Sequence, residues 1–195
     1  MRTFNFSPCF IIMYKRDKGR VKMIKPLIAE SPYPKIDRCE RDKHSVAVIS
    51  PAYCGGHGEL SAVLGYTYKN IHFKNLCEKA TAELLMNIAM AEMMHFQMLG
   101  EMICSLGVDP IFTAYPPCVG NYFNTSHISY SFSPSRMISD AIVGEIMAIK
   151  QYQLMLDSLK NERVKNLIER IIQDEQLHLT ALKQNFERQD AKVFY

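Results

Sequence analysis

Two short motifs recur in the same order in the two halves of this sequence. The first reads G-E-x-x-A-x-x-x-Y and the second reads E-x-x-H. Their ionisable and aromatic members are Glu59, Tyr66, Glu92 and His95 in the first half, and Glu145, Tyr152, Glu175 and His178 in the second. A doubled and ordered pair of motifs is a much more specific signal than one E-x-x-H on a helix.

The motifs are suited to binding metal ions. A glutamate and a histidine three residues apart lie on one helix face, so each E-x-x-H can offer an oxygen and a nitrogen to one ion. Glu92 also lies within an apolar run, where an unpaired carboxylate would be costly. No Lys or Arg lies within one turn of Glu59 or Glu92 on the same helical face. Two divalent cations would balance the four glutamates, so Glu59, Glu92, His95, Glu145, Glu175 and His178 are the predicted metal ligands.

The ligand types indicate which metals to expect. Oxygen-rich ligation with one imidazole per ion suits iron or manganese better than structural zinc, which favours thiolates and closed tetrahedra. Such ions keep open coordination positions for peroxide or dioxygen. We therefore expect two iron or two manganese ions as cofactors, and hydrogen peroxide or dioxygen as the substrate.

The elements that position these residues are predicted to be helices. Residues 51–73, 75–106, 137–159 and 162–189 are rich in helix formers, and a proline-rich connection spans residues 107–135. If paired glutamates are level across each hairpin, the turns should lie near residues 75–76 and 160. The prediction is an all-α four-helix bundle over residues 51–195, made of two hairpins joined by one long crossover, after an irregular N-terminal arm over residues 1–50.

This set of residues resembles the dinuclear metal site of the ferritin-like superfamily, most closely its rubrerythrin and bacterioferritin branches. The resemblance covers residues 50–189. It implies that Glu59 and Glu145 are terminal ligands, Glu92 and Glu175 bridging carboxylates, and His95 and His178 nitrogen ligands. It also implies that Tyr66 and Tyr152 hydrogen-bond to carboxylates, and they are the candidate catalytic residues.

Two departures from the rubrerythrin pattern bear on the reaction. Rubrerythrins carry an extra carboxylate one turn from the third-helix glutamate, whereas Ile142 and Ala148 flank Glu145 here. They also usually carry a rubredoxin-type iron module, and this chain has no C-x-x-C. Peroxidase turnover would need a separate electron donor. In ligand count the site is closer to bacterioferritin or the manganese catalases, and the latter need no external electrons.

Composition narrows the remaining functions. The net charge of +3 is too small and too scattered to indicate nucleic-acid binding. No apolar run reaches the roughly 18 residues of a membrane span. The apolar patch near Phe10 lacks a cleavage site, so we expect a cytoplasmic protein. We also expect a homo-oligomer.

Some alternatives and neighbouring residues need separate expectations. The methionines between Met86 and Met102 are interpreted as core packing, so no haem is expected. Asp174 is expected on an exposed face, and His57, His72 and His127 in solvated or loop positions. The alternative functions are metal storage in a hollow shell and a structural coat protein that binds no metal.

Overall fold

The computed structural model describes the backbone of residues 14–17 and 20–193. A short β hairpin, with strands β1 (Tyr14–Asp17) and β2 (Arg20–Met23), precedes five α-helices. The helices are α1 (Lys43–Cys54), α2 (Glu59–Asn75), α3 (Lys79–Ser105), α4 (Pro134–Ser158) and α5 (Glu162–Val193). Two 3-10 turns (Val119–Asn121 and Thr125–His127) lie between α3 and α4.

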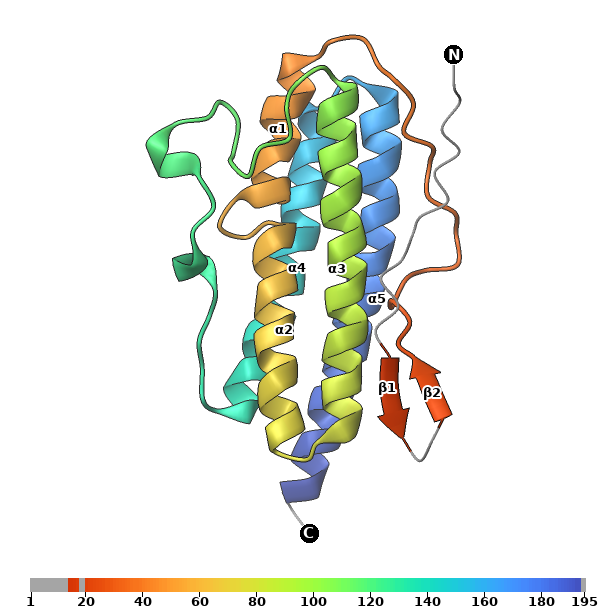
Figure 1. Ribbon diagram of the computed structural model, residues 1–195, viewed down its shortest axis with the longest axis vertical. Helices are drawn as coiled ribbons and strands as arrows, with labels where there is room; N and C mark the ends of the chain where they lie inside the picture. The colour runs from red at the N-terminus through yellow and green to blue at the C-terminus, as the bar shows by residue number, and fades with distance from the viewer. Residues whose placement is uncertain (1–13, 18–19, 194–195) are drawn as a thin grey trace.

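The helices form the predicted four-helix bundle of two antiparallel hairpins. Helices α2 and α3 make one hairpin and α4 and α5 the other, with α1 stacked in line with α2 along the bundle (Figure 1). The tight turns fall between Asn75 and Lys79 and between Ser158 and Glu162, where the level pairing of the glutamates placed them. The prediction of an all-α, ferritin-like fold is confirmed.

The first long helix predicted from the sequence is broken in two. It ends at Cys54 and resumes at Glu59, so the expected continuous stretch from residue 51 is wrong. A Cβ at Gly58 would lie 2.5 Å from the Ala52 carbonyl oxygen, so the chain can turn here only with a glycine. Glu59 is therefore the first residue of α2. Because α1 already starts at Lys43, the irregular region ends at residue 42 and not at residue 50.

The N-terminal arm has more structure than the sequence indicated. Strands β1 and β2 pair antiparallel, with Tyr14 opposite Met23. The chain then runs along the side of the bundle beside α3 and α5 before it enters α1 (Figure 1). The apolar patch around Phe10, expected not to be a signal peptide, lies outside the described residues.

Two apolar clusters pack the bundle, one on each side of a polar layer. One includes Ile49, Leu106 and Leu167, and the other includes Phe73, Leu85 and Ile138. On α3 and α5 the residues between the two clusters are those of the E-x-x-H motifs. The core therefore supports the polar layer from above and below.

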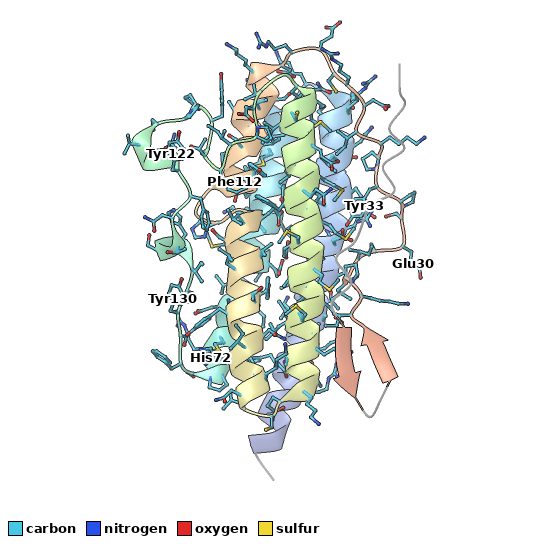
Figure 2. The ribbon with its side chains drawn as sticks, viewed as in Figure 1. Glu30, Tyr33, His72, Phe112, Tyr122 and Tyr130 are labelled. Atoms are coloured by element: carbon cyan, nitrogen blue, oxygen red, sulfur yellow. The ribbon has the colours of Figure 1, made fainter. Side chains whose placement is uncertain are left out.

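The long crossover between α3 and α4 lies along α1 and α2, on the left of Figure 1. Tyr53 of α1 donates a hydrogen bond to the Pro110 carbonyl at 3.0 Å. Tyr68 of α2 packs edge-on against Tyr130, which Figure 2 labels on the crossover. The crossover thus covers one side of the bundle. Among the described helices, none is both long and apolar enough to cross a membrane.

Candidate metal centre

The six predicted ligands meet in one buried cluster at the middle of the bundle. Each helix of the two hairpins contributes, and no member is more than 4% exposed. Their ligand atoms form two overlapping groups, each within 4.8 Å. The groups are Glu59, Glu92, His95 and Glu175, and Glu92, Glu145, Glu175 and His178. Glu92 and Glu175 belong to both groups, which is the arrangement expected of two carboxylates that bridge a pair of ions.

Both histidines direct their Nδ1 atoms at the shared carboxylates. His95 Nδ1 lies 3.1 Å from Glu92 and 3.2 Å from Glu175. His178 Nδ1 lies 3.2 Å from Glu92 and 3.3 Å from Glu175. The two unshared carboxylates are farther away, with Glu59 at 3.7 Å from His95 and Glu145 at 3.9 Å from His178. The arrangement follows the internal repeat and is nearly two-fold.

The two repeated tyrosines bond across the bundle. Tyr66 of α2 donates a hydrogen bond to Glu145 of α4, and Tyr152 of α4 donates one to Glu59 of α2. Each tyrosine therefore holds the glutamate of the opposite hairpin, not the one in its own motif. Burial and the nearby carboxylate charges raise the pKa of both phenols well above the usual range, so both remain protonated donors.

Four carboxylates are buried together with two imidazoles, and if all four were ionised the two histidines could not balance their charge. Burial, then the charge of Glu92, raises the pKa of Glu59 well above its usual range. Burial and Glu175 do the same for Glu145. In the described part of the chain, no Lys or Arg nitrogen lies within 4.0 Å of these carboxylates. A buried group of four carboxylates fits divalent cations, which would take the place of the protons that these groups hold in the metal-free protein.

The outward nitrogens of the histidines fit the same interpretation. His178 Nε2 lies 2.8 Å from the Leu27 carbonyl oxygen, which can only accept a hydrogen bond. His95 Nε2 lies 2.9 Å from an oxygen of Asp174. Nε2 therefore carries a hydrogen in both rings, and the Nδ1 lone pair faces the carboxylates once its proton is displaced. This is the tautomer that a metal bound at Nδ1 requires.

Asp174 is the residue that the sequence analysis placed wrongly. It is fully buried and not on an exposed face. Burial raises the pKa of Asp174, but hydrogen bonds from His95, Tyr33 and the Ala29 N–H outweigh it and lower that pKa to about 2. Its position four residues after Arg170 and four before His178 was the available signal. The Leu27 carbonyl, a backbone group, leaves no such signal.

A cavity of about 140 Å³ leads to the cluster between α2 and α4. Glu59, Glu145 and both repeated tyrosines line its inner end, and Gly65 and Gly144 leave it free of side chains along the helices. His127 and Ile128 of the crossover line it as well. Lys69 also faces it and is only 8% exposed; burial lowers the pKa of its ammonium group, partly offset by Asp140 and Glu145. A small molecule can therefore approach the cluster from this side.

The three histidines expected in solvated or loop positions lie apart from the cluster. His57 is exposed beside the break between α1 and α2, and His72 packs against the Tyr68 ring. His127 reaches the cavity wall from the crossover. The structure gives these three no part in the buried group of six.

Comparison with known proteins identifies the family. The rubrerythrin family model matches residues 56–185, two thirds of the chain. The chain belongs to the rubrerythrin family. The match includes all six clustered residues and both tyrosines, whereas the N-terminal arm and α1 lie outside it. No curated protein sequence matches this rubrerythrin-family chain.

Two solved structures are similar to the fold of this rubrerythrin-family protein. Both are crystal structures of KatB, a manganese catalase from Anabaena. Each has a TM-score of 0.73 at 19% identity, and the similarity covers 83% of this chain and 80% of the other. At this identity the likeness shows a shared fold.

Proposed function

We propose that this protein is a dinuclear-metal oxidoreductase that disproportionates hydrogen peroxide. Glu59, Glu92, His95, Glu145, Glu175 and His178 would hold two manganese or two iron ions. The observation that carries the proposal is the pair of overlapping ligand groups that share Glu92 and Glu175. Dioxygen is the other expected substrate, and the test below also measures its uptake.

When bound, a pair of redox-active ions would take up the two electrons that one peroxide gives and pass them to the next. The residues of the chain orient the carboxylates and control access to the site. Tyr152 and Tyr66 hold the Glu59 and Glu145 carboxylates in place by hydrogen bonds. Because their raised phenol pKa values keep them protonated, they act as donors to carboxylate oxygens and orient them. The cavity between α2 and α4 admits peroxide, while the two apolar clusters keep bulk water from the other sides.

The choice of disproportionation rests on electron supply. One peroxide is oxidised to dioxygen and gives up two electrons and two protons, and a second peroxide takes them up and becomes two waters. No external reductant enters this balance, which suits a chain without C-x-x-C. The positions flanking Glu145 by one turn, Ile142 and Ala148, also offer no additional carboxylate. A peroxidase with a separate electron donor is the second candidate.

The test is a peroxide assay on protein loaded separately with manganese and with iron. Metal content is measured first, and peroxide loss and dioxygen release are then followed with and without a reductant. Dioxygen released at one per two peroxides without reductant supports the proposal. Peroxide loss only with reductant favours the peroxidase, and dioxygen uptake without peroxide chemistry indicates a ferroxidase. A protein with two ions per chain that is inert to both oxidants contradicts all three.

We also propose that the protein is a homo-oligomer. The outer face of α4 carries four exposed apolar side chains, Val143, Ile146, Met147 and Leu154. An apolar stripe on a helix is typical of a surface that packs against another chain. Light scattering of the purified protein tests this, and a monomer at micromolar concentration would contradict it. A large hollow shell would favour the storage alternative.

A further inference from the structure

The two histidines of the metal centre have unlike partners at their outward nitrogens. His95 Nε2 lies 2.9 Å from the Asp174 carboxylate, whereas His178 Nε2 lies 2.8 Å from the Leu27 carbonyl oxygen. One partner is charged and held on α5, and the other is a neutral backbone group of the N-terminal arm. The near two-fold symmetry of the six ligands therefore ends at this outer layer.

The internal repeat explains where the asymmetry comes from. Asp174 immediately precedes Glu175, and it bonds to the histidine of the other motif, His95. The residue at the matching position before Glu92 is Ala91, which is buried and has no side-chain acceptor. A repeat of the same contact, from residue 91 to His178, is therefore absent, and the Leu27 carbonyl bonds His178 instead.

Residues 27–33, here named the strap, are held at this place by several polar contacts. The Leu27 N–H donates to the Asn87 carbonyl of α3 at 3.0 Å. The Ala29 N–H donates to Asp174 at 2.6 Å, and the Tyr33 hydroxyl also donates to Asp174. The strap therefore contacts the outward partner of one histidine and supplies the outward partner of the other.

Arg170 of α5 locks the strap to the same carboxylate. Its guanidinium donates to the carbonyls of Ser31 at 2.7 Å and Ala29 at 2.9 Å, and to Asp174 at 2.7 Å. It also lies 4.0 Å from the centre of the Tyr33 ring. Arg170 and Asp174 are both buried, and their pairing makes this interaction costly to break. Tyr33 lies on the arm side of the bundle in Figure 2.

We propose that the strap is a working part of the metal centre and that it makes the two metal positions inequivalent. This rests on the proposed dinuclear site. An imidazole that donates to a carboxylate is a stronger ligand than one that donates to a carbonyl, so the position at His95 binds its ion more tightly. Because the strap and the ions act on the same histidines, strap docking and metal binding stabilise each other. Asp174 and Tyr33 are positioning residues.

The test is a titration of the metal-free, full-length protein with Mn²⁺ in competition with a chelating indicator. Wild-type protein should bind two ions in two resolved steps. The Asp174→Asn variant keeps the shape but removes the charge, and should weaken the tighter step by roughly ten- to a hundredfold while leaving the other within about twofold. Asp42→Asn, the same change at the N-cap of α1 and remote from the site, should leave both steps unaltered.

Two further measurements keep the result interpretable if Asp174→Asn folds poorly. Tyr33→Phe removes only the hydroxyl contact and should shift the tighter step in the same direction by a smaller factor. Hydrogen exchange of wild-type protein should show slower exchange of the strap amides, Ala29 among them, once Mn²⁺ is bound.

Distinct outcomes separate the two proposals. Wild-type protein that binds neither manganese nor iron overturns the dinuclear site and this inference together. Two bound ions with identical steps, equal weakening of both steps by Asp174→Asn, or strap exchange that metal leaves unchanged would overturn the strap's role alone.

Discussion

The phenol of Tyr152 on α4 donates a hydrogen bond to the carboxylate of Glu59 on α2, so the two hairpins are joined within the layer of predicted ligands. The reciprocal bond runs from Tyr66 to Glu145. A tyrosine seven residues after a glutamate thus serves the glutamate of the other repeat. Both unshared carboxylates are oriented by the hairpin to which they do not belong.

Removing either hydroxyl should affect turnover more than metal content. Tyr66→Phe and Tyr152→Phe keep the ring in the core but free one carboxylate oxygen, which can then rotate. A hydrogen bond to a charged group contributes about 1.5–3 kcal/mol, so we expect peroxide turnover to fall by roughly ten- to a hundredfold. Steady-state kinetics with metal analysis measure this. Tyr68→Phe, whose hydroxyl bonds to the Ser131 carbonyl outside the cluster, is the matched control and should change neither.

Glu92 belongs to both ligand groups, so its loss should disturb both ions. The Glu92→Ala variant is expected to retain less than one metal per chain by elemental analysis. Wild-type protein should melt at a higher temperature with excess Mn²⁺, by the equivalent of about 2.7 kcal/mol at a hundredfold excess over Kd, and the variant should lose that gain. Glu101→Ala, on the exposed face of the same helix, should behave as wild type. Full metal occupancy in Glu92→Ala would show that the carboxylate is not a ligand.

If peroxide enters through the cavity between α2 and α4, a side chain that fills the cavity should slow turnover without removing the metal ions. Ala148 lines it, and a leucine there would fill much of the 140 Å³. We expect Ala148→Leu to keep two ions per chain while kcat/KM for peroxide falls about tenfold or more, the equivalent of about 1.4 kcal/mol. Ala80→Leu adds the same volume at an exposed position on α3 and should have no effect. Unchanged kinetics in a folded Ala148→Leu protein would indicate another route.

Stability and metal affinity should respond to pH in opposite directions. Burial lowers the pKa of His95 and His178, but the surrounding carboxylates outweigh it and raise both well above the usual value. The pKa values of Glu59 and Glu145 are also raised well above the usual value. Groups with raised folded pKa values stabilise the protein below their unfolded values and lose that effect as pH rises through the folded ones. Metal-free protein should therefore lose stability as pH rises above about 4.3, where the two glutamates contribute, and further above about 6.5, where the two histidines do.

At the acid end the sign reverses. The pKa of Asp174 is lowered to about 2, so its contribution is present above its unfolded value of about 3.9 and disappears as pH falls toward 2. Metal binding displaces protons from the two histidines and from Glu59 and Glu145, whose pKa values are raised. Mn²⁺ affinity should therefore increase with pH, and binding should release protons. Thermal melts of metal-free protein and calorimetry in two buffers measure these effects. A Mn²⁺ affinity that does not change between pH 5 and pH 8 would exclude the cluster as the binding site.

The sequence was a good guide where a periodic pattern controlled the structure. The doubled motif placed the six predicted ligands in one layer, and the spacing of Glu59 to Glu92 and of Glu145 to Glu175 located both hairpin turns. Apolar periodicity and helix formers are local properties, so they can be recognised without knowing the tertiary contacts. The rubrerythrin resemblance followed from the same residues and is confirmed.

The sequence failed where a backbone group or a distant segment decides the structure. The break before Glu59 depends on how closely Gly58 approaches the Ala52 carbonyl, which no helix propensity reports. Asp174 has the pattern of a surface charge, but it is buried, with contacts from the N-terminal arm, from His95 and from Arg170. The ligand assignments and the catalytic roles of Tyr66 and Tyr152 stay predictions.

Isotope labelling tests the central claim most directly. Manganese-loaded protein is mixed with doubly ¹⁸O-labelled hydrogen peroxide in unlabelled water, without reductant, and the released gas is analysed by mass spectrometry. Disproportionation at this site predicts dioxygen in which both atoms are ¹⁸O, at one molecule per two peroxides, and none from the Glu92→Ala variant. A protein with two ions per chain that releases no labelled dioxygen, or an equally active Glu92→Ala variant, would contradict it.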